Sequence, residues 1–329
     1  MKHKFLHHSY RRPTGLRSAC RALALSVTII LFTSNPCAAQ NGPKASPRSA
    51  KQHSEVTLKS ASFHSASLNR EMHYVVLLPV GYDASEQRYP VLFLLHGLYG
   101  DDKNWSTRTN LAKYTRNLHL IIAMPDAGNS WYVNSAMNPT EKYEDYIIKD
   151  FIEEIDTHYR TIREGYARAI TGLSMGGYAA VKFSLKYPNL FAFAGGISAA
   201  LDAPADLDET HPEFRDNLRK AFGERGNPVR SQNDVFVLLL HADIKALPYF
   251  YLDCGSDDSF LDVNRKFALS LRQLKAPYEF HELQGGHTWE YWDTAIDRFL
   301  IALAKSNFAH GAMLSVTARA KENRPFRAT

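Results

Sequence analysis

Short, nearly uninterrupted runs of apolar residues constrain the fold of this chain more than any other feature. Residues 90–95 (PVLFLL) and 118–124 (LHLIIAM) lack the alternation of a half-exposed strand, which is typical of strands buried on both faces. Residues 143–158 instead repeat apolar positions at helical spacing, with acidic residues between them, and this predicts an amphipathic helix. Alternation of the two patterns predicts an α/β fold, a mainly parallel central sheet with helices on both faces.

The same patterns place the remaining elements. Two early strands, 55–62 and 72–78, are expected to pair antiparallel, and further strands are expected at 167–171, 191–197, 249–252 and 278–283. Helices are expected at 175–186, 260–274 and 289–304. Residues 203–245 break the alternation, and we expect this segment to be an insertion that covers one end of the sheet.

The N-terminal segment has the pattern of a signal peptide. Residues 1–39 hold six cations, no acid, and an apolar run of eleven residues at 22–32, followed by small residues around Cys37. This predicts a signal peptide at 1–39, export to the periplasm or medium, and cleavage before Gln40. An uncleaved anchor is the less favoured alternative, because eleven residues rise only about 16 Å as a helix and a hydrocarbon core is about 30 Å thick.

The charge of the chain lies mostly at its ends. Residues 40–52 predict a flexible leader, and the basic segment 307–329 predicts a disordered tail. The domain expected between them, 53–306, has 26 cations and 33 acids, a net charge of −7, although the whole chain carries +5. An acidic domain does not favour a nucleic-acid partner. No membrane span is expected once the signal peptide is removed, and the sequence predicts no oligomeric state.

The string from Thr171 to Gly177 contains Gly-x-Ser-x-Gly between an apolar run and a helical pattern. This context predicts a nucleophile elbow, a tight strand-to-helix turn that holds Ser174 in a strained conformation. Glycines two residues before and after the serine let the backbone segments pass closely. The turn would present the hydroxyl at a helix N-terminus, where amide donors favour developing negative charge.

A serine hydroxyl needs a base to accept its proton. His287 follows the last predicted strand and two glycines and precedes the final predicted helix, the position expected of that base. The carboxylate that orients it is expected after the 249–252 strand, where Asp257 and Asp258 are both better placed than Asp253. The chain order serine, aspartate, histidine is that of α/β-hydrolases.

Three further predictions concern the surroundings of the serine. The glycine-bearing turn 95–100 follows a buried strand, so the backbone N–H groups of Leu98 and Met175 are expected to form the oxyanion hole. His96 is expected to brace this turn rather than act as a base. A further set of aromatic side chains is expected either to line a substrate pocket or to pack in the core: Trp105, Trp131 and Tyr132.

Six strings resemble those of the esterase D or putative-esterase branch of α/β-hydrolases, over about 72–304. They are LHGLYG (95–100), WSTRTNL (105–111), SWY (130–132), GLSMGGYAA (172–180), and the pair LDCGSDDSFL (252–261) and GGHTWEYW (285–292). The branch includes tributyrin esterases, S-formylglutathione hydrolases, feruloyl esterases and the antigen 85 mycolyltransferases, and the tributyrin-esterase type is the most similar in these strings. The resemblance implies that Asp258, not Asp257, is the acid, and it implies the same oxyanion donors. The tail after 306 departs from the family pattern.

The expected function is an exported serine carboxylesterase that hydrolyses short-chain acyl, acetyl or feruloyl esters of small molecules or carbohydrates through an acyl-enzyme. Alternatives are an acyltransferase of antigen 85 type, an S-formylglutathione hydrolase-like thioesterase, which the signal peptide disfavours, and a catalytically inactive binding protein. The sequence has no zinc-ligand spacing, dinucleotide-binding fingerprint or phosphate-binding loop, so no metal or cofactor is expected.

Overall fold

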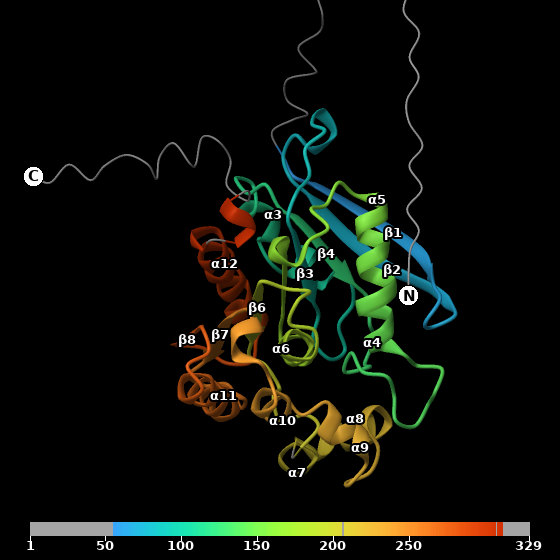
Figure 1. Cartoon of the computed structure of the whole chain (residues 1–329), viewed down its shortest axis with the longest axis vertical. Helices are drawn as coiled ribbons and strands as arrows, with labels where there is room; N and C mark the ends of the chain where they lie inside the picture. Colours follow the sequence, from blue (N-terminus) through green and yellow to red (C-terminus); the bar gives the residue numbers. More distant parts are fainter. Residues whose placement is uncertain (1–54, 206, 307, 312–329) are drawn as a thin grey trace, which may run out of the picture. The chain divides into compact units, whose positions relative to one another are not determined.

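The computed structural model describes residues 55–205, 207–306 and 308–311. The predicted signal peptide (1–39), the leader (40–52) and most of the tail lie outside the described residues. Within them, the apolar runs form an eight-stranded sheet (Figure 1). Its strands are β1 (Thr57–Ser65), β2 (Arg70–Leu78), β3 (Val91–Leu95), β4 (Ile121–Pro125), β5 (Arg168–Gly172), β6 (Phe193–Ile197), β7 (Tyr249–Gly255) and β8 (Tyr278–Leu283).

The strands lie in the order β1-β2-β4-β3-β5-β6-β7-β8. β1 pairs antiparallel with β2 and β2 antiparallel with β4, whereas every later pair is parallel. The predicted mainly parallel α/β sheet with an antiparallel pair at its start is therefore confirmed. The carboxyl ends of the parallel strands lie at one edge of the sheet, where ligands bind in folds of this type.

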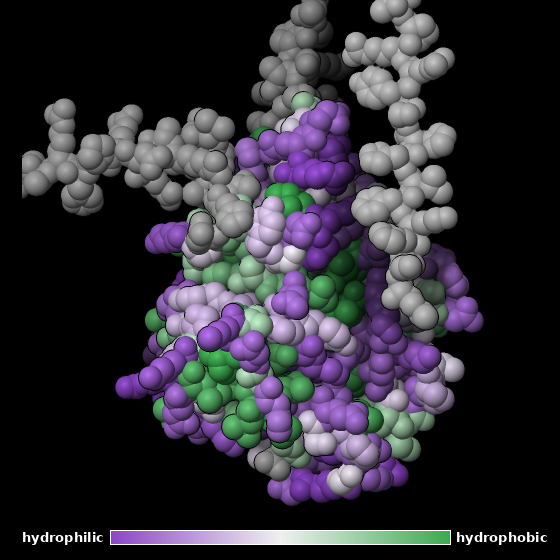
Figure 2. Space-filling model, viewed as in Figure 1, coloured by the Kyte–Doolittle hydropathy of each residue, from purple (hydrophilic) through white to green (hydrophobic). Residues whose placement is uncertain are grey.

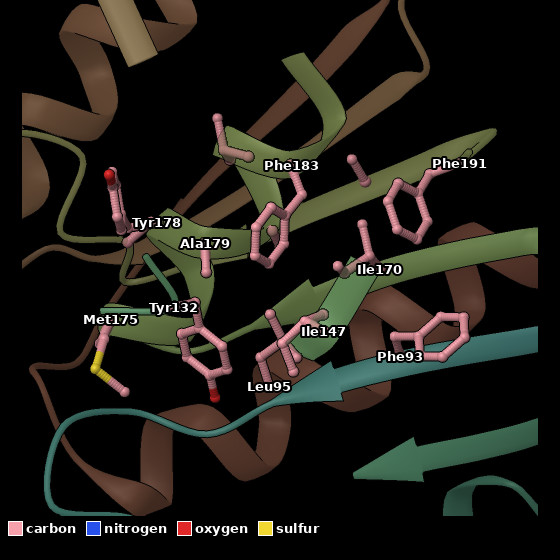
Figure 3. Packing of buried hydrophobic residues seen from close by; sticks show 14 of the residues in the cluster. Phe93, Leu95, Tyr132, Ile147, Ile170, Met175, Tyr178, Ala179, Phe183 and Phe191 are labelled. Atoms are coloured by element: carbon pink, nitrogen blue, oxygen red, sulfur yellow. The ribbon is translucent and has the colours of Figure 1, made fainter. Parts of the chain in front are cut away.

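The register of β3 shows why its sequence has no polar alternation. Val91, Phe93 and Leu95 pack into one hydrophobic cluster, whereas Leu92 and Leu94 pack into another on the opposite face. Figure 3 shows the first cluster, which contains Phe93 and Leu95 of β3 together with residues of β5 and α6. Because both faces of the strand are buried, both sets of positions must be apolar.

Helices cover both faces. α6 packs on β3, β5 and β6 on the side of the first cluster, and α12 packs on β6 and β7 on the side of the second. The expected helix at 143–158 is formed by α4 and α5 with a π-helical turn (Tyr146–Phe151) between them. The helices are α2 (Asn104–Arg108), α3 (Leu111–Tyr114), α4 (Tyr143–Asp145), α5 (Ile152–His158), α6 (Met175–Lys186), α7 (Leu207–Thr210), α8 (Arg215–Phe222), α9 (Pro228–Gln232), α10 (Val235–Leu240), α11 (Leu261–Gln273) and α12 (Trp289–Lys305).

The segment 203–245 forms four short helices, α7 to α10, which lie together at one end of the domain (Figure 1). Side-chain caps begin two of them, since Asn227 accepts from Val229 N–H at α9 and Asp234 accepts from Phe236 N–H at α10. We refer to this segment as the helical insertion.

The predicted disorder of 307–329 is wrong for its first residues. Phe308–Gly311 forms a 3₁₀ turn in which Phe308 and Ala309 are buried in the second hydrophobic cluster. Burial of the phenyl ring offsets part of the chain entropy that ordering the turn costs. Residues 307 and 312–329 lie outside the described residues.

Hydrophilic residues predominate on the face shown in Figure 2, with hydrophobic residues in separate groups among them. Single exposed apolar side chains of this kind are ordinary for a folded domain. None of the helices that the structure describes has the length and apolar character needed to cross a bilayer.

Candidate active site

Ser174 lies in a strained turn between β5 and α6. Its backbone has φ 53° and ψ −115°, a conformation that costs a non-glycine residue of order 1–3 kcal/mol. The neighbouring glycines are required by close approach. A Cβ at Gly172 would lie 2.6 Å from the backbone carbon of Gly176, and a Cβ at Gly176 would lie 2.6 Å from the carbonyl oxygens of Leu95 and His96. The turn has the predicted geometry of a nucleophile elbow.

His287 and Asp258 meet although 29 residues separate them. His287 follows β8, and its Nδ1 lies 2.9 Å from Oδ2 of Asp258, in the turn after β7. Oδ1 of the same carboxylate accepts from Phe260 N–H at 2.9 Å. Burial by itself would raise the pKa of Asp258, but the hydrogen bond and charge of His287, together with hydrogen bonds from Phe260 N–H and Ser198, hold that pKa below its ordinary value.

The neighbouring carboxylate does not contact His287. Asp257 is exposed, and its Oδ2 accepts from the side chain of Gln284 at 2.8 Å. Asp253 is buried inside the sheet, where Arg298 donates two hydrogen bonds to it. Of the three aspartates in this segment, only Asp258 is therefore positioned to orient the imidazole of His287.

The rings on either side of His287 limit how it can turn. Phe260 packs at 5.1 Å between ring centroids, and Trp292 meets it edge to face at 4.8 Å. About a third of the His287 side chain remains exposed. The imidazole is thus fixed by packing and by Asp258, with one edge open towards the pocket.

Ser174 and His287 line the same pocket, of about 710 Å³. Its wall comes from the segments after β3, β4, β5, β7 and β8, together with the helical insertion. The lining residues are Gly97, Leu98, Tyr99, Gly100, Asn104, Arg108, Trp131, Leu173, Ser174, His211, Glu213, Phe214, Ser259, Phe260, His287, Thr288, Trp289, Glu290 and Trp292. This volume suits a small organic substrate.

The backbone donors predicted for the oxyanion hole lie beside the serine. Met175 is the first residue of α6, and Leu98 lines the pocket in the turn after β3. In the part of the chain that the structure describes, neither N–H group donates a hydrogen bond to another protein group. Both donors are therefore available to a ligand atom.

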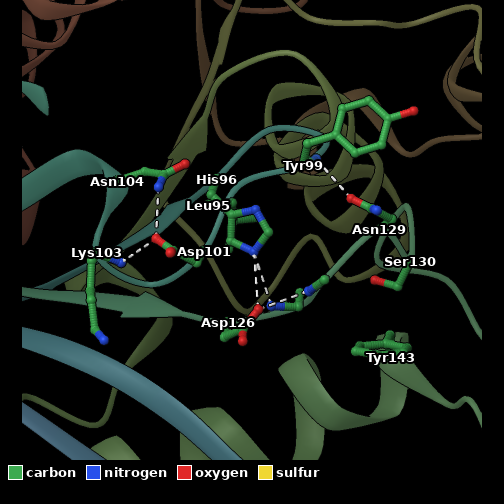
Figure 4. A network of polar contacts seen from close by, with 12 residues as sticks. Leu95, His96, Tyr99, Asp101, Lys103, Asn104, Asp126, Asn129, Ser130 and Tyr143 are labelled. Atoms are coloured by element: carbon green, nitrogen blue, oxygen red, sulfur yellow. Dashed lines mark hydrogen bonds and ion pairs between the residues drawn. The ribbon is translucent and has the colours of Figure 1, made fainter.

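His96 braces the turn that carries Leu98, as predicted. Its Nδ1 donates to the carbonyl of Gly97 at 2.8 Å. Its Nε2, on the side of Asp126 in Figure 4, accepts from Ala127 N–H at 3.0 Å. Burial lowers the pKa of His96, so the neutral form with the proton on Nδ1 satisfies both contacts. Asp126 lies 3.7 Å from the same imidazole.

The three aromatic residues considered for the substrate pocket divide into two groups. Trp131 lines the pocket. Trp105 and Tyr132 do not, although all three rings are buried. These two donate to the backbone at the start of the oxyanion turn, Trp105 Nε1 to the Leu95 carbonyl at 3.0 Å and Tyr132 Oη to the His96 carbonyl at 3.1 Å. A pocket-lining role for these two residues was the wrong alternative, since they belong to the core and support the turn.

The position of Trp131 depends on an unusual backbone. Trp131 and Tyr132 both have φ 54°, a region that L-residues rarely adopt. Lys182, buried in α6, donates to the Tyr132 carbonyl at 2.5 Å and to Glu144 at 2.9 Å. This buried cation holds the strained turn in place.

Several pocket residues could not be predicted from the sequence. His211, Glu213 and Phe214 come from the helical insertion, where no motif or periodicity marks them. Arg108 lies over the ring of Trp289, 5.5 Å from its centroid. Among the described residues, no group of histidine, cysteine and carboxylate side chains is arranged to hold a metal ion.

A strained serine turn at the carboxyl end of a central parallel strand, on a sheet of this order, defines an α/β-hydrolase. Comparison with known proteins supports this class. Esterase Rv1288 of Mycobacterium tuberculosis is 30% identical over 240 residues, which are 65% of this chain and 52% of the relative, so the chain spans about half its length. An acetyl esterase of Caldicellulosiruptor saccharolyticus is 24% identical over 256 residues, 73% of this chain and 96% of the relative.

A solved structure extends the similarity. The fluorophosphonate-binding serine hydrolase F of Staphylococcus aureus superposes with a TM-score of 0.69 at 26% identity, over 77% of this chain and all of that one. The model of the putative esterase family matches residues 65–303. The chain therefore belongs to the putative esterase family, and it is a serine hydrolase that acts on carboxylic ester bonds.

Proposed function

We propose that the protein is an exported carboxylesterase that hydrolyses short-chain acyl, acetyl or feruloyl esters through an acyl-enzyme on Ser174. The observation that carries the proposal is the strained Ser174, in one pocket with a His287 that is bound to Asp258. This is the combination that acyl transfer needs: a nucleophile, a base and a group that orients the base.

In the proposed first half-reaction, Ser174 Oγ attacks the ester carbonyl while His287 Nε2 takes its proton. The negative oxygen of the tetrahedral intermediate accepts hydrogen bonds from Leu98 N–H and Met175 N–H. Asp258 keeps the His287 proton on Nδ1 and stabilises the imidazolium that forms. His287 then protonates the leaving alcohol, and the acyl group stays on Ser174.

In the second half-reaction, water replaces the alcohol. His287 removes a proton from water as it attacks the acyl-enzyme, the same two amides stabilise the second tetrahedral intermediate, and protonation of Ser174 Oγ releases the acid. The aromatic part of the pocket wall, including Trp131 and Phe214, suits an acyl chain or ring of modest size.

The test is hydrolysis of p-nitrophenyl acetate and butyrate by purified wild type and Ser174→Ala. We expect the variant to lose activity by several orders of magnitude while its melting temperature stays close to that of wild type. Hydrolysis by Ser174→Ala at the wild-type rate would rule out an acyl-enzyme on this serine. Mass spectrometry of products formed with an added alcohol would separate hydrolysis from acyl transfer.

Export rests on residues 1–39, and it has its own test. Expression of the full chain, followed by fractionation and N-terminal sequencing of the mature protein, is expected to give an exported chain that begins at Gln40. A cytoplasmic chain that keeps its N-terminal residues would contradict export and leave the ester chemistry untouched.

A further inference from the structure

The helical insertion brings one imidazole into the pocket beside the reacting groups. His211 lines the same pocket as Ser174 and His287. Phe214 and Phe260 stack on its ring, with centroid distances of 5.8 and 5.3 Å and interplanar angles of 9° and 19°. Because both phenyl rings lie nearly parallel to the imidazole, they contact its faces and leave the nitrogen atoms on its edge for polar partners.

This stack continues to the reacting histidine. Phe260, which stacks on His211, also packs against His287 at 5.1 Å. Its own position is fixed from the other side, since its N–H donates to Asp258. His211 is therefore held against a fixed part of the site, although it comes from a separate segment of the chain.

Both contacts of Thr210 are satisfied together when the proton of neutral His211 lies on Nδ1. Thr210 Oγ1 lies 3.3 Å from the Leu207 carbonyl, which can only accept, so the single hydroxyl proton points there. The same Oγ1 lies 2.9 Å from His211 Nδ1. With its proton already used, the hydroxyl accepts from Nδ1–H, and the neutral ring has an unprotonated Nε2.

Nε2 is an acceptor without a protein donor. No group within 55–205, 207–306 or 308–311 forms a hydrogen bond with this atom. The insertion adds one other ionisable side chain to the pocket wall, Glu213, which is exposed. The His211 ring is stacked on two phenyl groups and has one unused acceptor in a pocket of substrate size. It is therefore arranged to meet a hydrogen-bond donor on a ligand.

We propose that His211 is a specificity-determining residue, whose Nε2 accepts a hydrogen bond from a hydroxyl group of the ester substrate. The proposal rests on the ester hydrolysis proposed above and deepens it, because it assigns a hydroxyl to the preferred acyl or alcohol group. An ester that lacks this hydroxyl leaves Nε2 without a partner. One neutral hydrogen bond corresponds to about 2- to 13-fold in kcat/KM.

The experiment compares esters that differ by one hydroxyl. Methyl 4-hydroxycinnamate against methyl cinnamate tests the acyl side, and 3-hydroxypropyl butyrate against propyl butyrate tests the alcohol side. We expect wild type to prefer the hydroxylated ester of at least one pair by about 2- to 13-fold in kcat/KM. In His211→Phe, which keeps an aromatic ring between Phe214 and Phe260 but has no acceptor, that ratio is expected to fall to about one.

Two further variants separate the acceptor from the packing. His211→Gln offers an amide oxygen near the position of Nε2 and is expected to keep part of the preference even if His211→Phe folds poorly. Glu213→Gln removes the neighbouring carboxylate and is expected to keep the wild-type ratio.

The outcomes are distinct. Absence of any preference in wild type, an unchanged preference in His211→Phe, or a preference lost in Glu213→Gln alone would each overturn the assignment to His211. If Ser174-dependent hydrolysis is present without such a preference, only the role of His211 fails. If no ester is hydrolysed in a Ser174-dependent manner, the proposed function fails as well.

Discussion

Asparagine in place of Asp258 tests the most specific contact in the site. Two contacts of the carboxylate matter here: Oδ2 lies 2.9 Å from His287 Nδ1, and Oδ1 accepts from Phe260 N–H at 2.9 Å. The side chain of Ser198 also hydrogen-bonds the carboxylate. In Asp258→Asn the amide oxygen is expected to keep the Phe260 bond, because a backbone N–H can only donate. The new NH₂ group then faces His287 Nδ1.

That geometry changes the tautomer of the imidazole. Nδ1 must now accept, so the proton of neutral His287 moves to Nε2, the atom that has to take the proton of Ser174. Since side-chain volume and the Phe260 bond are unchanged, the fold should survive. We expect kcat to fall by about 10³- to 10⁴-fold, which is about 4–5.5 kcal/mol of transition-state stabilisation.

Asp257→Asn is the matched control. It is the same substitution one residue earlier, at an exposed carboxylate that contacts Gln284 rather than His287. With p-nitrophenyl butyrate at pH 7.5, we expect about wild-type kcat from Asp257→Asn, and unfolding temperatures within a few degrees for all three proteins. The reasoning is refuted if Asp258→Asn keeps more than a tenth of wild-type kcat, or if Asp257→Asn loses as much.

Four smaller predictions concern the supports of the site. Gly176→Ala, whose Cβ would lie 2.6 Å from two carbonyl oxygens, is expected to lower both the yield of folded protein and kcat; normal yield and kcat would contradict the close approach. Lys182→Met leaves Glu144 with one lysine fewer and should cost about 3–5 kcal/mol of unfolding free energy in denaturant titrations. The matched change at an exposed lysine, Lys149→Met, should cost less than about 1 kcal/mol. Equal losses would refute the argument that burial makes the Lys182 ion pair matter more. Burial by itself would raise the pKa of Glu144, but its two lysines lower it to about 2. The contribution of this carboxylate to stability is therefore present above about pH 4.3 and lost as pH falls towards 2. The stability deficit of Glu144→Gln should shrink between pH 7 and pH 3 in thermal unfolding, and a constant deficit would be inconsistent with this linkage. Burial raises the pKa of Cys254, so a thiol reagent should modify it only after unfolding; rapid labelling of the native protein would count against its position in β7.

Much of the fold and part of the site follow from local sequence. The apolar run at 91–95 predicts a doubly buried strand because both faces of the sheet are covered, and the glycines around Ser174 predict the elbow because no Cβ fits there. His287 could be predicted because the turn after the last strand, followed by a helix, lies beside the serine in any sheet that orders its strands in this way. These features are properties of short windows of the chain, and sterics and periodicity within a window determine them.

Other features depend on where distant segments meet. The pattern of residues alone did not decide whether Asp257 or Asp258 orients His287. Only the direction of the turn after β7 brings Asp258 to His287. Trp105 and Trp131 are equally apolar in the sequence, yet one supports the turn after β3 and the other lines the pocket.

His211 shows the same limit most clearly. It lies in a polar segment without a motif, and it gains its place only because the helical insertion packs against Phe260. The sequence by itself determined the elements, the elbow and the order of the reacting residues, since each is encoded by contacts within a few positions along the chain. The tertiary structure decided which side chains converge on Ser174. Packing of the whole domain sets the distances between separate segments, and no single segment determines them.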